Sequence, residues 1–292
     1  SMDDSLLNAI HNLVPHTYGV DDFPVIFQTK FFKTDATGGV YIYDTCCSAG
    51  PGYKKDYDYV INGVVHPYLE VPANMVRLRL LNGDGKFSFN LGPVDQANNP
   101  ETFQLIATDA GYTDSSYAMS EVLISPGERT EWLLDLRGRA GDTLYIRNHV
   151  SNIPNGVIGN SSTTQGYATD QNLLMVVVKP NTLPPSPINT FPIQLHPLEI
   201  PAYNANTKVR TKTFYKSPAR RSDGTLTSSI FNIDSTVMDM MVVNDTVMLD
   251  STEIWEIVNT TAIAHPWHIH EVHFFEIEVR DSYDNIIPKR RM

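Results

Sequence analysis

The chain has 292 residues, of which 41% are hydrophobic and 19% charged, and this composition is typical of a globular protein rather than a disordered or fibrous one. The formal net charge is −11 and basic residues group only at Lys289-Arg290-Arg291, so we expect neither nucleic acid nor an anionic membrane as a partner. No stretch reaches the ~20 apolar residues of a membrane helix. One domain usually takes about 100–150 residues, so the length favours two domains.

In chain order, the one candidate for helix is a short amphipathic stretch, SLLNAIHNLV, at residues 5–14. Short apolar segments that alternate with polar residues follow, separated by turns rich in Gly, Pro and Asn, and this pattern is typical of β-strands. The clearest predicted strands are 76–82, 130–136, 142–148, 173–179, 253–259 and 273–280. We therefore predict an all-β protein built from β-sandwiches.

A Pro-rich segment divides the chain. KPNTLPPSPINTFP, at residues 179–192, carries five prolines and follows a strongly apolar strand, so it is typical of a stiff linker between domains. We predict a first domain at 21–180, a linker at 181–190 and a second domain at 191–292.

One sequence pattern occurs in both predicted domains. VINGVVHPYLEVPANMVRLRLLNG (60–83) and VVNDTVMLDSTEIWEIVNTT (242–261) both pass from apolar residues through Asn-Gly or Asn-Asp to an alternating strand that ends in Asn. The segment 122–136 repeats the later half, which favours two copies of one sandwich. A Greek-key sandwich takes roughly 100 residues or more, so we expect the second copy to be incomplete.

Histidines gather near the end of the chain, in AHPWHIHEVHFFEI at residues 264–277. In an extended strand, residues two apart face the same side, so His268 and His270 present their rings side by side. His265 precedes a proline and is displaced from this pair, and His273 has the opposite parity. Neutral imidazoles held in this way suit copper or zinc. The alternative is a set of partly exposed strand histidines without a metal.

The segment His265-Pro-Trp-His-Ile-His270 resembles the His-Pro-x-His-Leu/Ile-His segment in the third cupredoxin domain of multicopper oxidases. Further segments resemble, in family order, the second domain and the first half of the third, so the resemblance covers nearly the whole chain. These segments are 25–32, 59–83, 122–132, 231–240 and 249–270. The bilirubin-oxidase and spore-coat branch is the nearer one, because Glu271-Val272 stand where plant and fungal laccases have Gly-His.

This resemblance implies two cupredoxin-like Greek-key β-sandwiches in tandem, with residues 1–20 as the end of a first domain that the chain lacks. It implies copper as cofactor, with His265 ligating the type 1 copper, His268 the type 2 copper and His270 one type 3 copper. It also implies a phenolic, aromatic amine, pigment or metal-ion electron donor, dioxygen as the acceptor, and a secreted, periplasmic or spore or cell-surface location. His273 has no ligand counterpart and is interpreted as structural.

The chain lacks most of the ligands of such an enzyme. It holds no other His-x-His pair, and neither Cys46 nor Cys47 is flanked by histidine. The remaining histidines are interpreted as surface or turn residues: His11, His16, His66, His149 and His196. We therefore expect a fragment of an oxidase whose isolated chain has no turnover.

Other interpretations stay open. A non-enzymatic cupredoxin-like structural protein is one alternative, and an oxidase that another chain completes is a second. Met238, Met240 and Met241 suggest handling of cuprous ion, but a role as flexible filler in a strand core is favoured.

Overall fold

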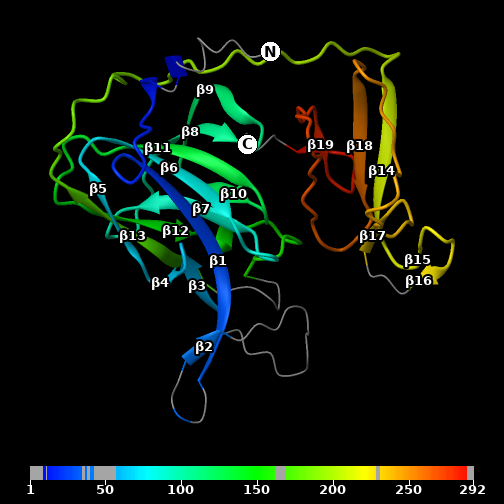
Figure 1. Ribbon diagram of the computed structural model, residues 1–292, viewed down its shortest axis with the longest axis horizontal. Helices are drawn as coiled ribbons and strands as arrows, with labels where there is room; N and C mark the ends of the chain where they lie inside the picture. Colours follow the sequence, from blue (N-terminus) through cyan, green and yellow to red (C-terminus); the bar gives the residue numbers. More distant parts are fainter. Residues whose placement is uncertain are drawn as a thin grey trace. The chain divides into compact units, whose positions relative to one another are not determined.

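The computed structural model describes residues 9–10, 12–34, 37, 40–42, 57–161, 169–227 and 231–287 (Figure 1). The chain divides into two compact units. The first contains Ser1–Leu198 together with His268–Met292, and the second contains Glu199–Trp267. Nearly all regular structure in the described residues is β-strand, which confirms the predicted all-β class.

Two large sheets form most of the first unit. The larger sheet has the strand order β4 (Val64–Val65), β3 (Tyr57–Ile61), β1 (Asp22–Thr34), β6 (Met75–Asn82), β11 (Arg129–Asp135), β8 (Phe103–Thr108) and β9 (Gly111–Met119), with β2 (Val40–Ile42) paired to β1. The smaller has the order β10 (Val122–Ile124), β7 (Phe89–Val94), β12 (Thr143–Asn148), β13 (Gln171–Lys179) and β5 (Tyr68–Pro72). A short 3-10 helix, η1 (Val150–Asn152), follows β12.

The main core lies between these two sheets, because the alternating strands direct their apolar side chains inward. Trp132 of β11 is fully buried and stacks on Phe103 of β8, with ring centroids 3.9 Å apart. Phe27 of β1 meets Phe89 of β7 across the two sheets, with ring centroids 6.4 Å apart. Burying one such aromatic side chain stabilises the fold by roughly 1.5–3 kcal/mol.

A second apolar cluster covers the outer face of the larger sheet. Ile10 and Val14, from the helical turn near the N-terminus, join Ile188 and Ile193 from the Pro-rich segment, together with Met75 and other buried side chains. The Pro-rich segment is also hydrogen-bonded, since Asn74 Nδ2 donates to Pro184 O at 2.9 Å and Arg137 Nη1 donates to Ile188 O at 2.8 Å. The segment is thus packed along the first unit, whereas the predicted domain bounds stay a prediction.

The second unit holds a sheet of β17 (Phe231–Ile233), β14 (Lys208–Lys216) and β18 (Glu253–Asn259), and a small pair of β15 (Ala219–Arg220) and β16 (Leu226–Thr227). Strands β14 and β18 are parallel, like β1 and β6 of the first unit. Equivalent residues lie opposite each other in the two strand pairs. Phe214 lies opposite Asn259, as Phe27 lies opposite Asn82. The alternating strand of the repeated sequence pattern is thus β6 in the first unit and β18 in the second, and each pairs with a parallel strand that lies outside the pattern.

The structure differs from the sequence prediction near the C-terminus. Of the predicted strand at 273–280, only Val279–Arg280 is a strand (β19), which pairs with Ile286–Ile287 (β20). Residues 273–278 have no assigned partner strand, and alternation alone cannot supply the ladder of backbone hydrogen bonds. No helix in the described part of the chain is long and apolar enough to cross a membrane.

Candidate metal centre

The histidine segment begins at the end of β18, where Asn259 organises a tight turn. The Asn259 side chain accepts a hydrogen bond from Thr261 N at 3.0 Å and donates one to Ile263 O at 2.7 Å. Thr260 bonds to the neighbouring strand, with its Oγ1 donating to Phe214 O at 2.6 Å. An Asn that bonds its own backbone two residues on is a common way to start a turn. This turn places His265.

His265 is enclosed by two aromatic rings of the second unit. Its ring stacks on Phe214, with centroids 4.9 Å apart and planes at 20°, and meets Phe231 edge-on at 5.0 Å. Its Nε2 is 2.8 Å from Thr261 Oγ1. Burial lowers the pKa of His265 below its usual value. Burial thus favours the neutral imidazole, which is the form that binds a metal.

His268 and His270 lie together. Their ring centroids are 4.9 Å apart with the planes at 74°, and both side chains are exposed, whereas Ile269 between them is half-buried. This alternation follows the parity of an extended chain, although residues 264–269 have no assigned strand partner. The structure thus pairs His268 with His270 as the sequence predicts. These two residues belong to the first unit and His265 belongs to the second.

The chain turns sharply after His270. Glu271 has a φ of 65°, a left-handed conformation that costs a residue with a Cβ about 1–2 kcal/mol. The glycine that plant and fungal laccases carry here would adopt it without that cost. His273 beyond the turn is exposed.

The donors in the described residues only partly suit copper. Neutral imidazole is a good copper ligand, and a blue copper centre requires two histidines and a thiolate. Within residues 57–161, 169–227 and 231–287, and in the shorter described stretches, no three His, Cys, Asp or Glu side chains come together to hold a metal. Cys46 and Cys47 lie outside the described residues. The chain thus presents individual imidazoles of a kind that suits copper, and the described residues do not close a metal site.

The single histidines differ from one another. His66 lies exposed in a turn with φ 50°, and His16 is exposed, both as predicted. His196 is half-buried, and His11 lies outside the described residues. His149 is not a surface residue, because it is 8% exposed and burial lowers its pKa, but it does lie in a turn, where its carbonyl oxygen accepts from Asn152 N at 3.0 Å. The alternation of apolar and polar residues in β12 ends at Asn148, so it does not predict that the side chain of the next residue is buried.

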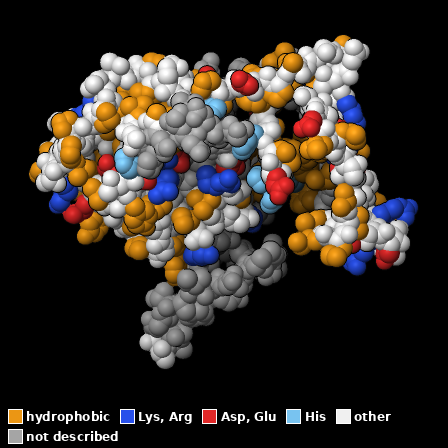
Figure 2. All heavy atoms as spheres, turned by 45° about the horizontal axis from the view of Figure 1, so that its top comes forward, with side chains coloured by type: hydrophobic (Ala, Val, Ile, Leu, Met, Phe, Trp, Pro, Cys, Tyr) orange, Lys and Arg blue, Asp and Glu red, His pale blue; other side chains and the backbone are white. Residues whose placement is uncertain are grey.

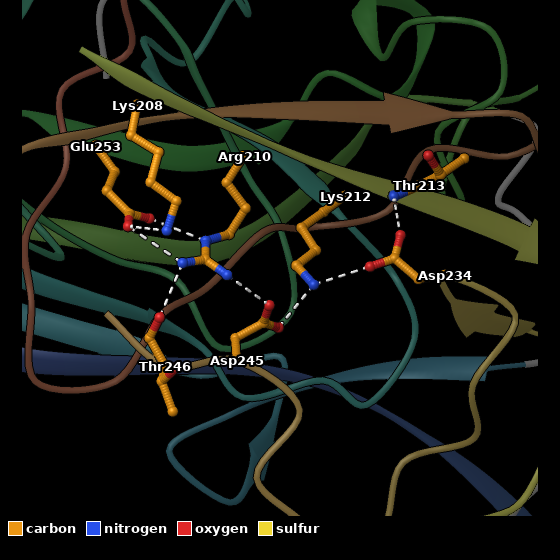
Figure 3. A network of polar contacts seen from close by, with 8 residues as sticks. All are labelled: Lys208, Arg210, Lys212, Thr213, Asp234, Asp245, Thr246 and Glu253. Atoms are coloured by element: carbon orange, nitrogen blue, oxygen red, sulfur yellow. Dashed lines mark hydrogen bonds and ion pairs between the residues drawn. The ribbon is translucent and has the colours of Figure 1, made fainter. Parts of the chain in front are cut away.

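Sequence reasoning missed a network of ion pairs beside β14 and β18 (Figure 3). Arg210 donates to Glu253 and to Asp245, each at 2.9 Å, and lies over the Trp255 ring at 5.2 Å. Lys212 bridges Asp234 and Asp245 at 2.8 and 2.7 Å. Hydrogen bonds from Arg210 and then Lys208 lower the pKa of Glu253 to about 2. The sequence signal was the basic residue at alternate positions 208, 210 and 212 of β14.

This ion-pair network connects the two ends of the segment that carries the methionines, because Lys212 pairs with both Asp234 and Asp245. Met238, Met240 and Met241 lie between Asp234 and Asp245, and they are 81%, 88% and 91% exposed. The preferred interpretation of these residues as core filler is therefore wrong for the described second unit. Figure 2 shows further hydrophobic side chains, in orange, on the surface of this unit.

Comparisons with known proteins relate the chain to the multicopper oxidases. Residues 202–290 match the family model described as multicopper oxidase. The chain is 28% identical over 267 residues to the cell division protein FtsP of Xenorhabdus nematophila, covering 89% of this chain and 49% of that protein. It is 38% identical over 123 residues to FtsP of Rahnella sp., covering 42% and 24%.

A solved structure extends the likeness to the fold. The 2F4 variant of the McoA multicopper oxidase of Aquifex aeolicus matches with a TM-score of 0.68 and 21% identity, covering 92% of this chain and 55% of that one. The chain thus spans about half, or less, of the length of these relatives. Residues 202–290 thus match a multicopper oxidase domain, and most of the chain has the cupredoxin-like β-fold of the multicopper oxidases.

Proposed function

We propose that the chain is part of a copper-dependent oxidoreductase in which His265 ligates a type 1 copper, His268 a type 2 copper and His270 a type 3 copper. One observation carries this proposal: the segment His265-Pro-Trp-His-Ile-His270 supplies imidazoles at the family spacing, and the rings of His268 and His270 are 4.9 Å apart. The matched multicopper oxidase domain supports it, because that match includes the whole segment.

Bound copper would supply one-electron chemistry, accepting electrons from a donor and passing them to dioxygen, which is reduced to water. The donor classes that we propose are phenols, aromatic amines, pigments and metal ions. We also propose a secreted, periplasmic or cell-surface location. The described residues do not close a copper site, so further ligands must come from elsewhere, including another chain.

The test is an anaerobic titration of the chain with Cu(I) against a coloured competing chelator. His268→Gln and His270→Gln should each weaken binding by at least about tenfold, because even losing an outer partner of a ligand typically costs 10–100-fold. His273→Gln is the matched control, since this exposed histidine has no assigned ligand role and should leave the affinity unchanged. Equal affinities for all four proteins would contradict the ligand assignment.

A second candidate function is a non-catalytic role like that of a cell division protein. Its support is that two curated relatives of the chain are named cell division protein FtsP. In that case the histidine segment has no metal-binding role, and the titration should show only weak Cu(I) binding that neither His268→Gln nor His270→Gln changes.

A further inference from the structure

The Thr261 hydroxyl lies at the centre of the turn that precedes His265. Its Oγ1 is 2.8 Å from Asn259 Oδ1, 2.9 Å from Ile263 O and 2.8 Å from His265 Nε2. All of these groups belong to the second unit. Thr261 is thus the only link by hydrogen bond between this turn and the His265 ring among the bonds of the described residues.

Counting protons fixes the direction of these bonds. The Asn259 amide is oriented by two contacts, because its Oδ1 accepts from Thr261 N and its Nδ2 donates to Ile263 O. Asn259 Oδ1 and Ile263 O are therefore both acceptors. A hydroxyl has one proton to donate, and both oxygens compete for it.

The bond to His265 must therefore run the other way. If the hydroxyl donated to Nε2, two close oxygen pairs, at 2.8 and 2.9 Å, would hold no proton between them, and such an arrangement is repulsive. If Nε2 carries the proton and donates to Oγ1, the hydroxyl proton is available to one of the two oxygens, and only one close oxygen pair is left without a proton.

We propose that Thr261 is a positioning residue that holds His265 in its Nε2–H tautomer and leaves Nδ1 as the nitrogen with a free lone pair. Stacking on Phe214 and the edge contact with Phe231 hold the ring in the same orientation. The role of Nδ1 as the metal-binding atom rests on the proposed function, whereas the tautomer itself does not. Partners of this kind orient metal-binding histidines in general.

The experiment is a long-range ¹H–¹⁵N correlation spectrum of the ¹⁵N-histidine-labelled full chain, without metal, at about pH 8, where an ordinary imidazole is neutral. His265→Gln assigns the signals by removing one set. We expect a protonated Nε2, an unprotonated Nδ1, and an Nε2–H proton that exchanges slowly enough to be observed.

Two substitutions separate positioning from intrinsic preference. Thr261→Val keeps the side-chain shape without the hydroxyl, so it should produce a mixture of tautomers and fast exchange of the Nε2–H proton. Thr261→Ser keeps the hydroxyl and should match the native chain. A protonated Nδ1 in the native chain, or identical tautomer ratios and exchange rates in the native chain and Thr261→Val, would overturn the proposal. No copper is present, so a failure of copper binding leaves this result unaffected.

Discussion

Glu253 shows how one side chain connects the stability of the second unit to pH. Arg210 and Lys208 hold its carboxylate, and they lower its pKa from an ordinary value near 4.5 to about 2. A carboxyl with a depressed folded-state pKa stabilises the fold above the unfolded-state pKa and loses this contribution as pH falls through the folded-state pKa. The stabilisation from Glu253 should therefore be complete above about pH 5 and decline between pH 4.5 and pH 2.

This pH dependence can be followed through the indole N–H signal of Trp255, which lies under Arg210. In the native chain the signal should weaken as pH falls through that range. Glu253→Gln should weaken it already at pH 6 and flatten the pH dependence, whereas Glu256→Gln, on an exposed position of the same strand, should behave like the native chain. The same pH profile for Glu253→Gln and the native chain would contradict this prediction.

Gly92 lies where no side chain fits. A Cβ at this position would stand 2.1 Å from Ser120 O and 3.2 Å from His149 Nε2. Gly92→Ala should therefore lower the free energy of unfolding by about 1–3 kcal/mol, as is usual for overpacking. Gly85→Ala is the control, because a Cβ there meets nothing within 4 Å. Urea unfolding of both variants checks the difference, and equal midpoints would refute the close contact.

Individual residues also show which contacts of the candidate site the sequence could predict and which it could not. The spacing of His268 and His270 predicted that their rings meet, because that relation is local to three residues. Arg210 and Lys212 occupy positions that correspond to Phe23 and Val25 in the repeated strand pair. Their carboxylate partners lie tens of residues away along the chain, so no local pattern could predict the ion pairs.

At the scale of elements, alternation predicted strands well where a partner strand exists. The predicted strand 253–259 coincides with β18, and 76–82 lies within β6, whose neighbours pair along its whole length. The same pattern failed over 273–278 because no strand pairs with it. A strand is defined by its hydrogen-bonded neighbour, which periodicity does not identify.

The Pro-rich segment has a stabilising role that its composition did not indicate. Ile188 is 1% exposed within the apolar cluster on the larger sheet. Ile188→Ala should lower the free energy of unfolding of the first unit by about 2–4 kcal/mol through lost burial and the cavity left behind. Leu198→Ala, at a position 46% exposed, should change it by less than about 0.5 kcal/mol. Thermal unfolding distinguishes a packed segment from a free linker, for which both changes would be small.

At the scale of the whole molecule, the described residues bring no three metal-binding side chains together, and Cys46 and Cys47 lack flanking histidines. The isolated chain, loaded anaerobically with Cu(I) and then exposed to air, should hold copper that is colourless, substoichiometric and easily removed by a chelator. Copper analysis and visible absorption test this expectation. A stable blue band with several coppers per chain would show that a thiolate and more histidines are recruited.

The assignment of His268 and His270 as copper ligands is tested most directly by pulsed electron paramagnetic resonance of the chain loaded with Cu(II), which detects the remote nitrogens of bound imidazoles. We predict couplings from imidazole nitrogens that are diminished in His268→Gln and in His270→Gln and unchanged in His273→Gln. Couplings that neither substitution alters would contradict the assignment.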